Sequence, residues 1–191
     1  FASSGSASAS GSSSRWVPIQ KLSAQTGQLI WNRRIAVAGE RYSRPSMVPS
    51  ASGNFIMLYV KGSGGFPPQS IMYAQKFSGE DGFPLWPEAT QVSSKNIPFF
   101  FFPQIHPDSE FGFFVIFNTG NPANPMLNDV FAQHVDTAGG IWTDEGIQLS
   151  MASDGNKYNG GYFWNPGDST LYAAIRIQNG NQTMSGIALQ K

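Results

Sequence analysis

The side chains with the chemistry for glycoside hydrolysis occur as three neighbouring acidic pairs, Glu80 with Asp81, Asp108 with Glu110, and Asp144 with Glu145. Hydrolysis of a glycosidic bond needs two carboxyl groups about 5 Å apart in a retaining enzyme, and a wider pair in an inverting one. Each acidic pair falls in a predicted turn or at a predicted strand edge, where carboxylates are ordinarily solvated. We therefore assign no catalytic residue from the sequence.

A sialidase-like enzyme would also need clustered arginines to bind the carboxylate of its substrate. The repeat described below does not place the arginines in register; they are Arg33, Arg34, Arg41, Arg44 and Arg176. The chain has no nucleophile-elbow motif, no P-loop and no dinucleotide-binding glycine motif. A glycoside-active propeller enzyme stays open as an alternative function, and it requires acids and arginines that converge on one face.

The residues that commonly hold metals are few. The chain has no cysteine and two histidines, His106 and His134, and neither histidine has a second one at metal-ligand spacing. His134 replaces a lysine found in the other repeats and is expected to be solvated, while His106 begins a His-Pro-Asp sequence that predicts a turn. The acidic turns at 108–110 and 154–156 contain fewer oxygen ligands than a calcium loop. No metal and no cofactor is therefore predicted.

Residues suited to recognition gather between the predicted strands. Aromatic, Asn, Arg and Lys side chains are common where proteins recognise other molecules, and loops on a rigid scaffold often carry function. The candidate ligand-binding residues are Arg41, Tyr42, Arg44, Lys95, Asn96, Lys157, Tyr158 and Asn159, together with Trp164, which departs from the repeat and is expected to line or fill a central channel. Loops at 118–124 and 179–181 belong to the same predicted face. The competing interpretation of this face is a merely polar rim.

A segment that recurs three times, and begins a fourth, sets the architecture that must position these residues. Its glutamines, Gln20, Gln75 and Gln133, are spaced 55 and 58 residues apart. Its tryptophans, Trp31, Trp86 and Trp142, are spaced 55 and 56 residues apart. A fixed period of this size indicates an array of similar supersecondary units. We expect the tryptophans to pack between units and the glutamines to hydrogen-bond neighbouring backbone.

Each period resolves into four strand candidates separated by Gly, Ser, Asn and Asp turns. Residues 55–60 and 113–117 are almost continuously apolar, which is typical of strands buried on both faces. The predicted strands are 17–23 and 29–38, then 45–50, 55–61, 70–77 and 85–93, then 100–105, 112–118, 129–135 and 141–150, and finally 161–165, 170–178 and 184–191. Four antiparallel strands per repeat describe a β-propeller blade. The predicted fold is all-β, with about three blades plus a partial one.

The predicted domain organisation follows from the same repeat. Residues 1–15 are a Ser/Gly/Ala-rich segment, read as a flexible linker, and residues 16–191 contain the blades, in units of 16–38, 39–93, 94–150 and 151–191. Because a propeller ring typically has at least four blades, we expect the chain to be part of a larger ring or to close a ring with another chain. The strands at 17–23 and 184–191 would otherwise be unpaired edges, so an isolated soluble monomer is not expected.

Within the repeat, Gln133-His134-Val135-Asp136, Gly140-Ile141-Trp142 and Gly146-Ile147-Gln148-Leu149-Ser150 resemble blades of large secreted and surface proteins of Bacteroidota, many of them exported by the type IX secretion system. The resemblance covers roughly residues 17–191 and implies an extracellular or cell-surface location. The C-terminal sorting domain of such proteins is absent from this sequence, which implies a fragment or a different export route. Residues 78–86 also resemble the Asp-box turn of sialidase-type propellers, a structural turn without catalytic meaning.

Composition excludes several other classes of protein. The 12 basic and 12 acidic side chains balance, and the basic residues are scattered, so nucleic acid is not an expected partner. No apolar run reaches the roughly 18–20 residues of a membrane helix. The predicted function is a non-catalytic, secreted or cell-surface interaction module that binds a protein partner or glycan through propeller loops. The second alternative, besides the enzyme, is a purely structural blade array in an adhesin or a secretion-associated complex.

Overall fold

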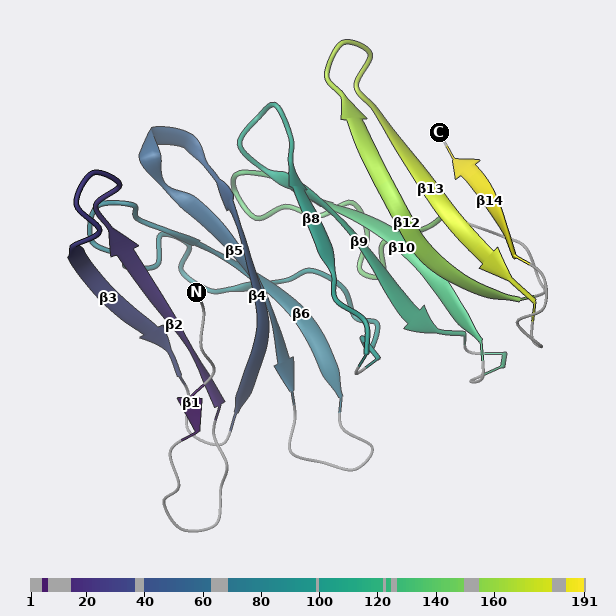
Figure 1. Cartoon of the computed structure of the whole chain (residues 1–191), viewed down its shortest axis with the longest axis horizontal. Helices are drawn as coiled ribbons and strands as arrows, with labels where there is room; N and C mark the ends of the chain where they lie inside the picture. Colours follow the sequence, from purple (N-terminus) through teal and green to yellow (C-terminus); the bar gives the residue numbers. More distant parts are fainter. Residues whose placement is uncertain are drawn as a thin grey trace.

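The computed structural model describes residues 5–6, 15–36, 40–62, 69–98, 100–121, 123–124, 127–149, 155–179 and 185–190. Over these residues the protein consists of β-strands and one short 3-10 turn, Ala51–Gly53, without an α-helix. The strands form blade-like antiparallel sheets that follow one another along the molecule (Figure 1). The predicted all-β, propeller-like fold class is therefore confirmed. In the described part of the chain, no helix is long and apolar enough to span a membrane.

Two full blades each contain four strands, paired in the order in which they occur in the chain. The first full blade consists of β4 (Arg41–Pro49), β5 (Phe55–Gly62), β6 (Ser70–Phe77) and β7 (Thr90–Gln91). The second full blade consists of β8 (Gln104–Pro107), β9 (Phe113–Gly120), β10 (Asn128–Val135) and β11 (Ile147–Gln148). All of these neighbours pair antiparallel, as a propeller blade requires.

Partial blades flank the two full ones. The C-terminal sheet consists of β12 (Asn156–Asn165), β13 (Thr170–Gln178) and β14 (Ser185–Gln190). The N-terminal hairpin consists of β2 (Arg15–Leu22) and β3 (Leu29–Ile35). A short strand, β1 (Gly5–Ser6), pairs with β2 inside the segment predicted to be a linker, while residues 1–4 and 7–14 of that segment lie outside the described residues. One parallel pair, Arg15 with Arg41, joins β2 to β4.

The strand boundaries depart from prediction mainly in the first and last strand of each unit. β4 begins at Arg41 rather than at residue 45, because a register shift between Ser43 and Ser46 accommodates Pro45, which cannot donate to the ladder. β12 begins at Asn156 rather than at residue 161, again with a register shift, between Asn159 and Gly161. The ladder tolerates both interruptions because bulges insert residues without ending the pairing.

The predicted fourth strands, 85–93 and 141–150, shrink to the two-residue strands β7 and β11. Pro84 and Pro87 have no backbone N–H to donate, so the approach to β7 cannot pair continuously. The predicted strand 100–105 is likewise displaced to Gln104–Pro107, after Pro103. The fourth strands therefore form short outer edges, which limits edge-to-edge pairing between molecules.

A separate hydrophobic cluster fills each interface between consecutive sheets. The N-terminal hairpin packs on the first full blade through Val17, Ile19, Tyr42, Met57, Tyr59 and Phe77. The two full blades share the largest cluster, which includes Ile56, Leu58, Val60, Met72, Ala74, Phe113, Val115, Phe117 and Phe131. The second full blade packs on the C-terminal sheet through Ile116, Val130, Ala132, Leu149, Ala173 and Ile175. Blade-to-blade contact thus supplies most of the buried apolar surface, as in other repeat architectures.

The recurring glutamines link the third strand of a blade to the segment before its fourth strand. The side-chain oxygen of Gln75 accepts the backbone N–H of Trp86 at 3.3 Å, and its amide donates to the carbonyl of Trp86 at 3.3 Å. The side-chain oxygen of Gln133 accepts the backbone N–H of Trp142 at 3.0 Å. These bonds satisfy backbone groups that the shortened fourth strands leave outside a ladder.

Two of the recurring tryptophans lie against the following blade. Trp31 of the hairpin stacks on Phe55 of the first full blade, with ring centroids 6.4 Å apart. The indole N–H of Trp86 donates to the carbonyl of Thr137, in a turn of the second full blade, at 3.3 Å. Trp142 differs, because 47% of its surface is exposed.

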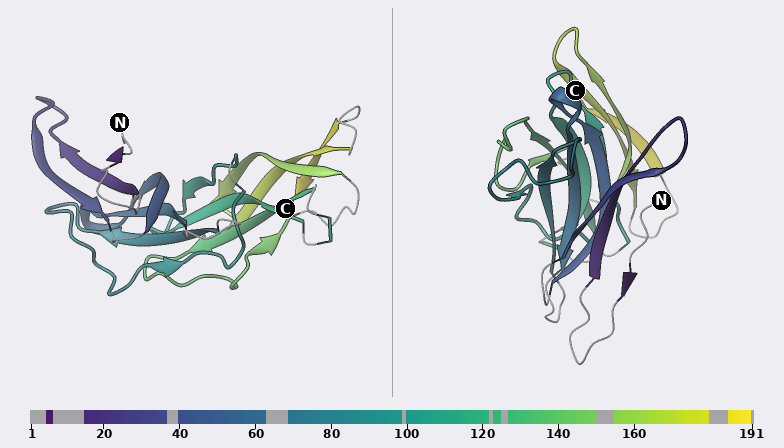
Figure 2. Two further views of the ribbon diagram at one scale, coloured as in Figure 1. Left: turned by 90° about the horizontal axis from the view of Figure 1, so that it is seen from below. Right: turned by 90° about the vertical axis from the view of Figure 1, so that its left-hand side faces the viewer.

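The sheets follow an arc, with the N-terminal hairpin at one end and the C-terminal sheet at the other (Figures 1 and 2). The described residues do not close this arc into a ring. The first strands of the sheets, β4, β8 and β12, come from three different units, and β4 packs beside β8. This neighbourhood forms the candidate site.

Candidate ligand-binding site on the first strands

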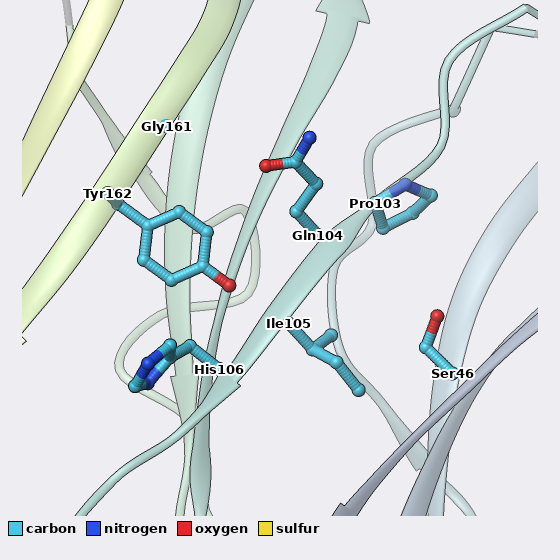
Figure 3. A pocket seen from close by; sticks show the side chains of 7 residues that line it. All are labelled: Ser46, Pro103, Gln104, Ile105, His106, Gly161 and Tyr162. Atoms are coloured by element: carbon cyan, nitrogen blue, oxygen red, sulfur yellow. The ribbon is translucent and has the colours of Figure 1, made fainter.

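A shallow cavity of about 520 Å³, widely open to solvent, lies among β4, β8 and β12. Seven residues line it: Ser46, Pro103, Gln104, Ile105, His106, Gly161 and Tyr162. Figure 3 shows the phenol of Tyr162 pointing into the space between Gln104 and His106. The lining combines a hydroxyl, an amide, an imidazole and a phenol with apolar carbon, which is the mixture expected of a site that recognises a polar small molecule.

Hydrogen bonds and ring contacts tie β8 to β12 at this cavity. The side-chain amide of Asn159 donates to Oε1 of Gln104 at 2.8 Å. The ring of His106 meets the ring of Tyr162 edge-on, with centroids 5.8 Å apart. Burial raises the pKa of Tyr162, so its hydroxyl keeps its proton throughout the neutral range and can donate to a ligand. The Gln104 and Tyr162 side chains are therefore held in place before any ligand binds.

Gly161 on β12 and Pro103 before β8 explain why the cavity is open on these two sides. Gly161 has a φ of +138°, which L side chains rarely adopt, and a Cβ built on it meets no atom within 4 Å. The register shift at Asn159 and Gly161 turns the strand locally, and Tyr162 follows directly. On the opposite wall, Pro103 ends the irregular segment before β8. The missing side chain at Gly161 leaves the space that Tyr162, Gln104 and His106 border.

Carboxyl groups are absent from the lining of this cavity, because none of its seven residues is Asp or Glu. The acidic pairs noted in the sequence have other contacts. Asp81 is fully exposed, and its hydrogen bond with Ser78 lowers its pKa. Asp108 bonds His134, with Oδ2 and Nε2 2.6 Å apart, and Glu145 pairs with Lys95 at 2.8 Å. Among the described residues, no group of three or more His, Asp or Glu side chains is arranged to hold a metal ion.

Two histidine predictions need correction. His106 lies in strand β8 and lines the cavity, rather than forming a turn. His134 is not simply solvated: it is part-buried, bonded to Asp108, and its ring lies 4.7 Å from that of Phe114 and 5.6 Å from that of Trp142. The surroundings of both histidines depend on strand pairing and on neighbouring strands and blades rather than on local sequence.

Two of the predicted ligand-binding residues are buried. Tyr42 lies in β4 within the hydrophobic cluster beside the N-terminal hairpin, and its hydroxyl donates to Glu40. Lys157 lies in β12, where its ammonium forms an ion pair with Asp129 at 2.5 Å. The prediction that these residues belong to exposed loops is wrong, since both strands begin earlier than the sequence pattern indicates. Their side chains face neighbouring blades.

The remaining candidates divide between the neighbourhood of the cavity and more distant surfaces. Asn159 bonds the cavity residue Gln104, as described above. Arg44 also lies in β4, with its guanidinium 5.4 Å from the ring centroid of Phe102, next in sequence to the cavity residue Pro103. Arg41, the first residue of β4, is not among the lining residues. Arg41 and Arg44, both predicted in a loop, are therefore strand residues, and of the two only Arg44 approaches the site.

Tyr158 lies between an aromatic ring and a cation. Its ring centroid is 5.9 Å from that of Phe101 and 4.7 Å from the guanidinium carbon of Arg176. Tyr158 and Asn159 both belong to β12, where a loop was predicted. Lys95 and Asn96 do lie outside the strands. Lys95 pairs with Glu145, and Asn96 accepts the backbone N–H of Ser70 at 2.7 Å, which anchors the start of β6.

Trp164 does not line the cavity. It lies near the end of β12, with its ring centroid 4.6 Å from that of Phe114. Its indole N–H is buried without a hydrogen-bond partner among the described residues. In the predicted loop at 118–124, Asn118 is buried in β9 and donates to the carbonyl of Lys157 at 2.7 Å. In the loop at 179–181, residues 180 and 181 lie outside the described residues.

Sequence reasoning missed the whole cavity, because none of its seven lining residues is among the predicted ligand-binding residues. One available signal is that all of them but Pro103 lie on the first strand of a unit. In a propeller these strands are neighbours around the ring, whatever their separation in sequence. Polar and aromatic residues on the first strands would therefore have been a better guide than the connecting segments.

No protein-family model matches the chain, and no curated protein matches it. Among solved structures, the chain is similar to the endo-arabinase from Bacteroides thetaiotaomicron VPI-5482, with a TM-score of 0.48 and 11% sequence identity. That similarity covers 98% of this chain and 69% of the endo-arabinase chain.

Proposed function

We propose that this protein is a non-catalytic recognition module that binds a glycan in the cavity among β4, β8 and β12. The observation that carries the proposal is the lining itself: the amide of Gln104, the imidazole of His106 and the phenol of Tyr162 border one space of about 520 Å³, without a carboxyl group. A sugar offers many hydroxyl groups and an apolar ring face, and this lining matches both. An extracellular or cell-surface location, implied by the resemblance of the repeat, is part of the proposal.

The aromatic groups beside the cavity support a glycan in particular. Phe102 exposes most of its ring and precedes the lining residue Pro103. The guanidinium of Arg44 lies over one face of the Phe102 ring, 5.4 Å from its centroid. The phenol of Tyr162 retains its proton, so that it donates to a sugar hydroxyl while Gln104 offers both a donor and an acceptor. Binding therefore follows from hydrogen bonds made by groups that are already ordered.

Glycan-array screening of the purified chain, followed by calorimetry with the best oligosaccharide, tests this proposal. We expect Gln104→Ala to weaken binding by about fivefold, because one hydrogen bond with a ligand contributes roughly 1 kcal/mol. We expect Phe102→Ala to weaken it as well, through the loss of the stacking surface. Gln25→Ala, an exposed glutamine in the turn after β2, is the matched control and should bind like the wild type.

Three outcomes would contradict the proposal. Binding that Gln104→Ala and Phe102→Ala leave unchanged would place the ligand elsewhere. Release of new reducing ends from the oligosaccharide at high protein concentration would favour the glycoside-active alternative. If no oligosaccharide on the array binds, the purely structural blade array replaces the glycan-binding module.

A further inference from the structure

The C-terminal sheet exposes the apolar face that every earlier sheet buries. Ala173 and Ile175 of β13 pack on the second full blade. The residues between and beside them, with their antiparallel partners on β14, therefore point to the opposite face. On this face Ile187 is 82% exposed and Leu189 is 73% exposed. Phe163, on β12, is paired with Tyr172 and is also exposed.

The internal repeat shows what covers this face elsewhere. The repeated glutamine of the C-terminal sheet is Gln190, and on this alignment Leu189 corresponds to Ala74 and Ala132, which are both buried beneath the following sheet. Ile187 corresponds in the same way to Met72 and Val130, which are also buried. The following sheet therefore covers these positions in both full blades. We call the face formed by Phe163, Ile187 and Leu189 the leading face.

The N-terminal hairpin has the complementary feature at the other end of the arc. Val17 and Ile19 of β2 pack on the first full blade, so the alternate residues Gln20 and Leu22 face away from it. Leu22 is 55% exposed, whereas the corresponding residues Phe77 and Val135 are buried against the preceding sheet. Ile30, on β3, is exposed as well. We call the face formed by Gln20, Leu22 and Ile30 the trailing face.

We propose that the leading face of one molecule docks on the trailing face of a second copy of this chain, head to tail. The three sheet-to-sheet interfaces within the chain already join a leading face to a trailing face, so the fourth contact continues an established packing mode. The copy supplies the missing partner for both faces at once, since each chain carries one of each. Such a contact is heterologous and repeats until the arcs close into a ring.

The two faces also suit each other chemically. Leu22 and Ile30 offer aliphatic side chains to Ile187, Leu189 and Phe163. Burying such side chains against one another removes apolar surface from water, which favours association. The six residues that define the two faces are uncharged, and each face also carries one exposed arginine, Arg176 opposite Ile187 on the leading face and Arg34 opposite Pro18 on the trailing face. The contact does not include the residues lining the cavity, and so does not depend on the proposed glycan binding.

Site-directed cross-linking tests the direction of the contact, and the absence of cysteine from the chain makes the test unambiguous. We expect a mixture of Leu22→Cys and Leu189→Cys proteins to form disulfide-linked dimers under mild oxidation. Each variant alone should form few, because a head-to-tail contact does not bring like positions together. A mixture of Glu80→Cys, in an exposed turn of the first full blade, with Leu189→Cys is the control and should remain uncross-linked.

Light scattering supplies the second measurement. The wild-type chain should have a mass at least twice that of the 20.7 kDa monomer, and Leu189→Asp should reduce it to the monomer. Because Leu189 is mostly exposed within one chain, that variant should keep the circular dichroism spectrum of the wild type. The proposal is overturned by a wild-type chain that stays monomeric at all concentrations. It is equally overturned if Leu189→Cys alone cross-links as well as the mixture does.

Discussion

At the scale of single residues, the most consequential contact is the buried ion pair between Lys157 and Asp129. The two side chains are 1% and 3% exposed, and they connect the C-terminal sheet to the second full blade. The other carboxylate oxygen of Asp129 accepts the amide of Asn121 at 2.8 Å. The pair therefore satisfies the charge of each partner in a place that water does not reach. Removing one partner leaves the other as a buried, unpaired charge.

We expect Lys157→Met to destabilise the protein by about 3–5 kcal/mol, because it leaves the Asp129 carboxylate buried and unpaired. The double replacement Lys157→Met with Asp129→Leu should recover most of this loss. Urea unfolding of the three proteins measures the differences. Lys95→Met is the control: Glu145, its partner, is largely exposed, so the loss should stay below about 1 kcal/mol. Equal losses for Lys157→Met and Lys95→Met would contradict this account.

A second prediction at this scale concerns alkaline pH. Burial raises the pKa of Tyr59 from 10.0 to about 12, with a contribution from nearby Glu40. The protonated form is thus favoured in the folded state, and its stabilisation is complete below the unfolded-state pKa and lost as the pH rises through the folded-state pKa. Thermal melts should therefore show stability falling between pH 10 and pH 12, and Tyr59→Phe should fall less steeply. A melting temperature that stays constant over this interval would rule out the effect.

At the scale of elements, the first full blade contacts the second through a tryptophan and a turn. Trp86 is 9% exposed and donates to Thr137 in the second full blade, while the corresponding Trp142 is 47% exposed. The backbone N–H of each tryptophan donates to the side-chain oxygen of a repeated glutamine. The indole of Trp86 thus joins two blades, whereas that of Trp142 is half-exposed, although the local sequence is similar in the two places.

We expect Trp86→Ala to lower stability by about 3–5 kcal/mol, the range for removing a large buried aromatic side chain. Trp142→Ala removes the same group from a half-exposed position and should cost less than half as much. Chemical unfolding of both variants against the wild type makes the comparison. If the two substitutions cost the same, the tryptophans stabilise their own blades rather than the interfaces between them.

At the scale of the whole molecule, stability should depend on protein concentration. A head-to-tail contact that forms only in the folded state stabilises that state by mass action, by about 2.7 kcal/mol at a concentration 100 times the dissociation constant. The melting temperature of the wild type should therefore rise with concentration, whereas that of Leu189→Asp should not. Calorimetry over a hundredfold range of concentration measures this. Parallel behaviour of the two proteins would argue that the leading face contributes nothing to assembly.

Local sequence predicted the second and third strands of each unit well. The boundaries of β6 and β13 agree with the predicted ranges, and β5 differs by one residue. These strands are continuous apolar or alternating segments between Gly-rich turns, so neighbouring residues in the chain already specify them. The first strands were predicted less well. Pro45 and Gly161 interrupt the strand pattern in the sequence, but pairing with the adjoining second strands keeps these segments extended.

By itself, the sequence determined the period of the repeat, the blade-like pairing order and the absence of cysteine chemistry, since all three depend on residue types and short spacings. Only the tertiary structure decided which side chains are buried between blades and which remain available. Tyr42 and Lys157 became interior residues, whereas Gln104 and Tyr162 came to border one cavity. The physical reason is that burial and cavities arise where separate strands pack together. How far apart two strands lie in the sequence does not show whether they pack together.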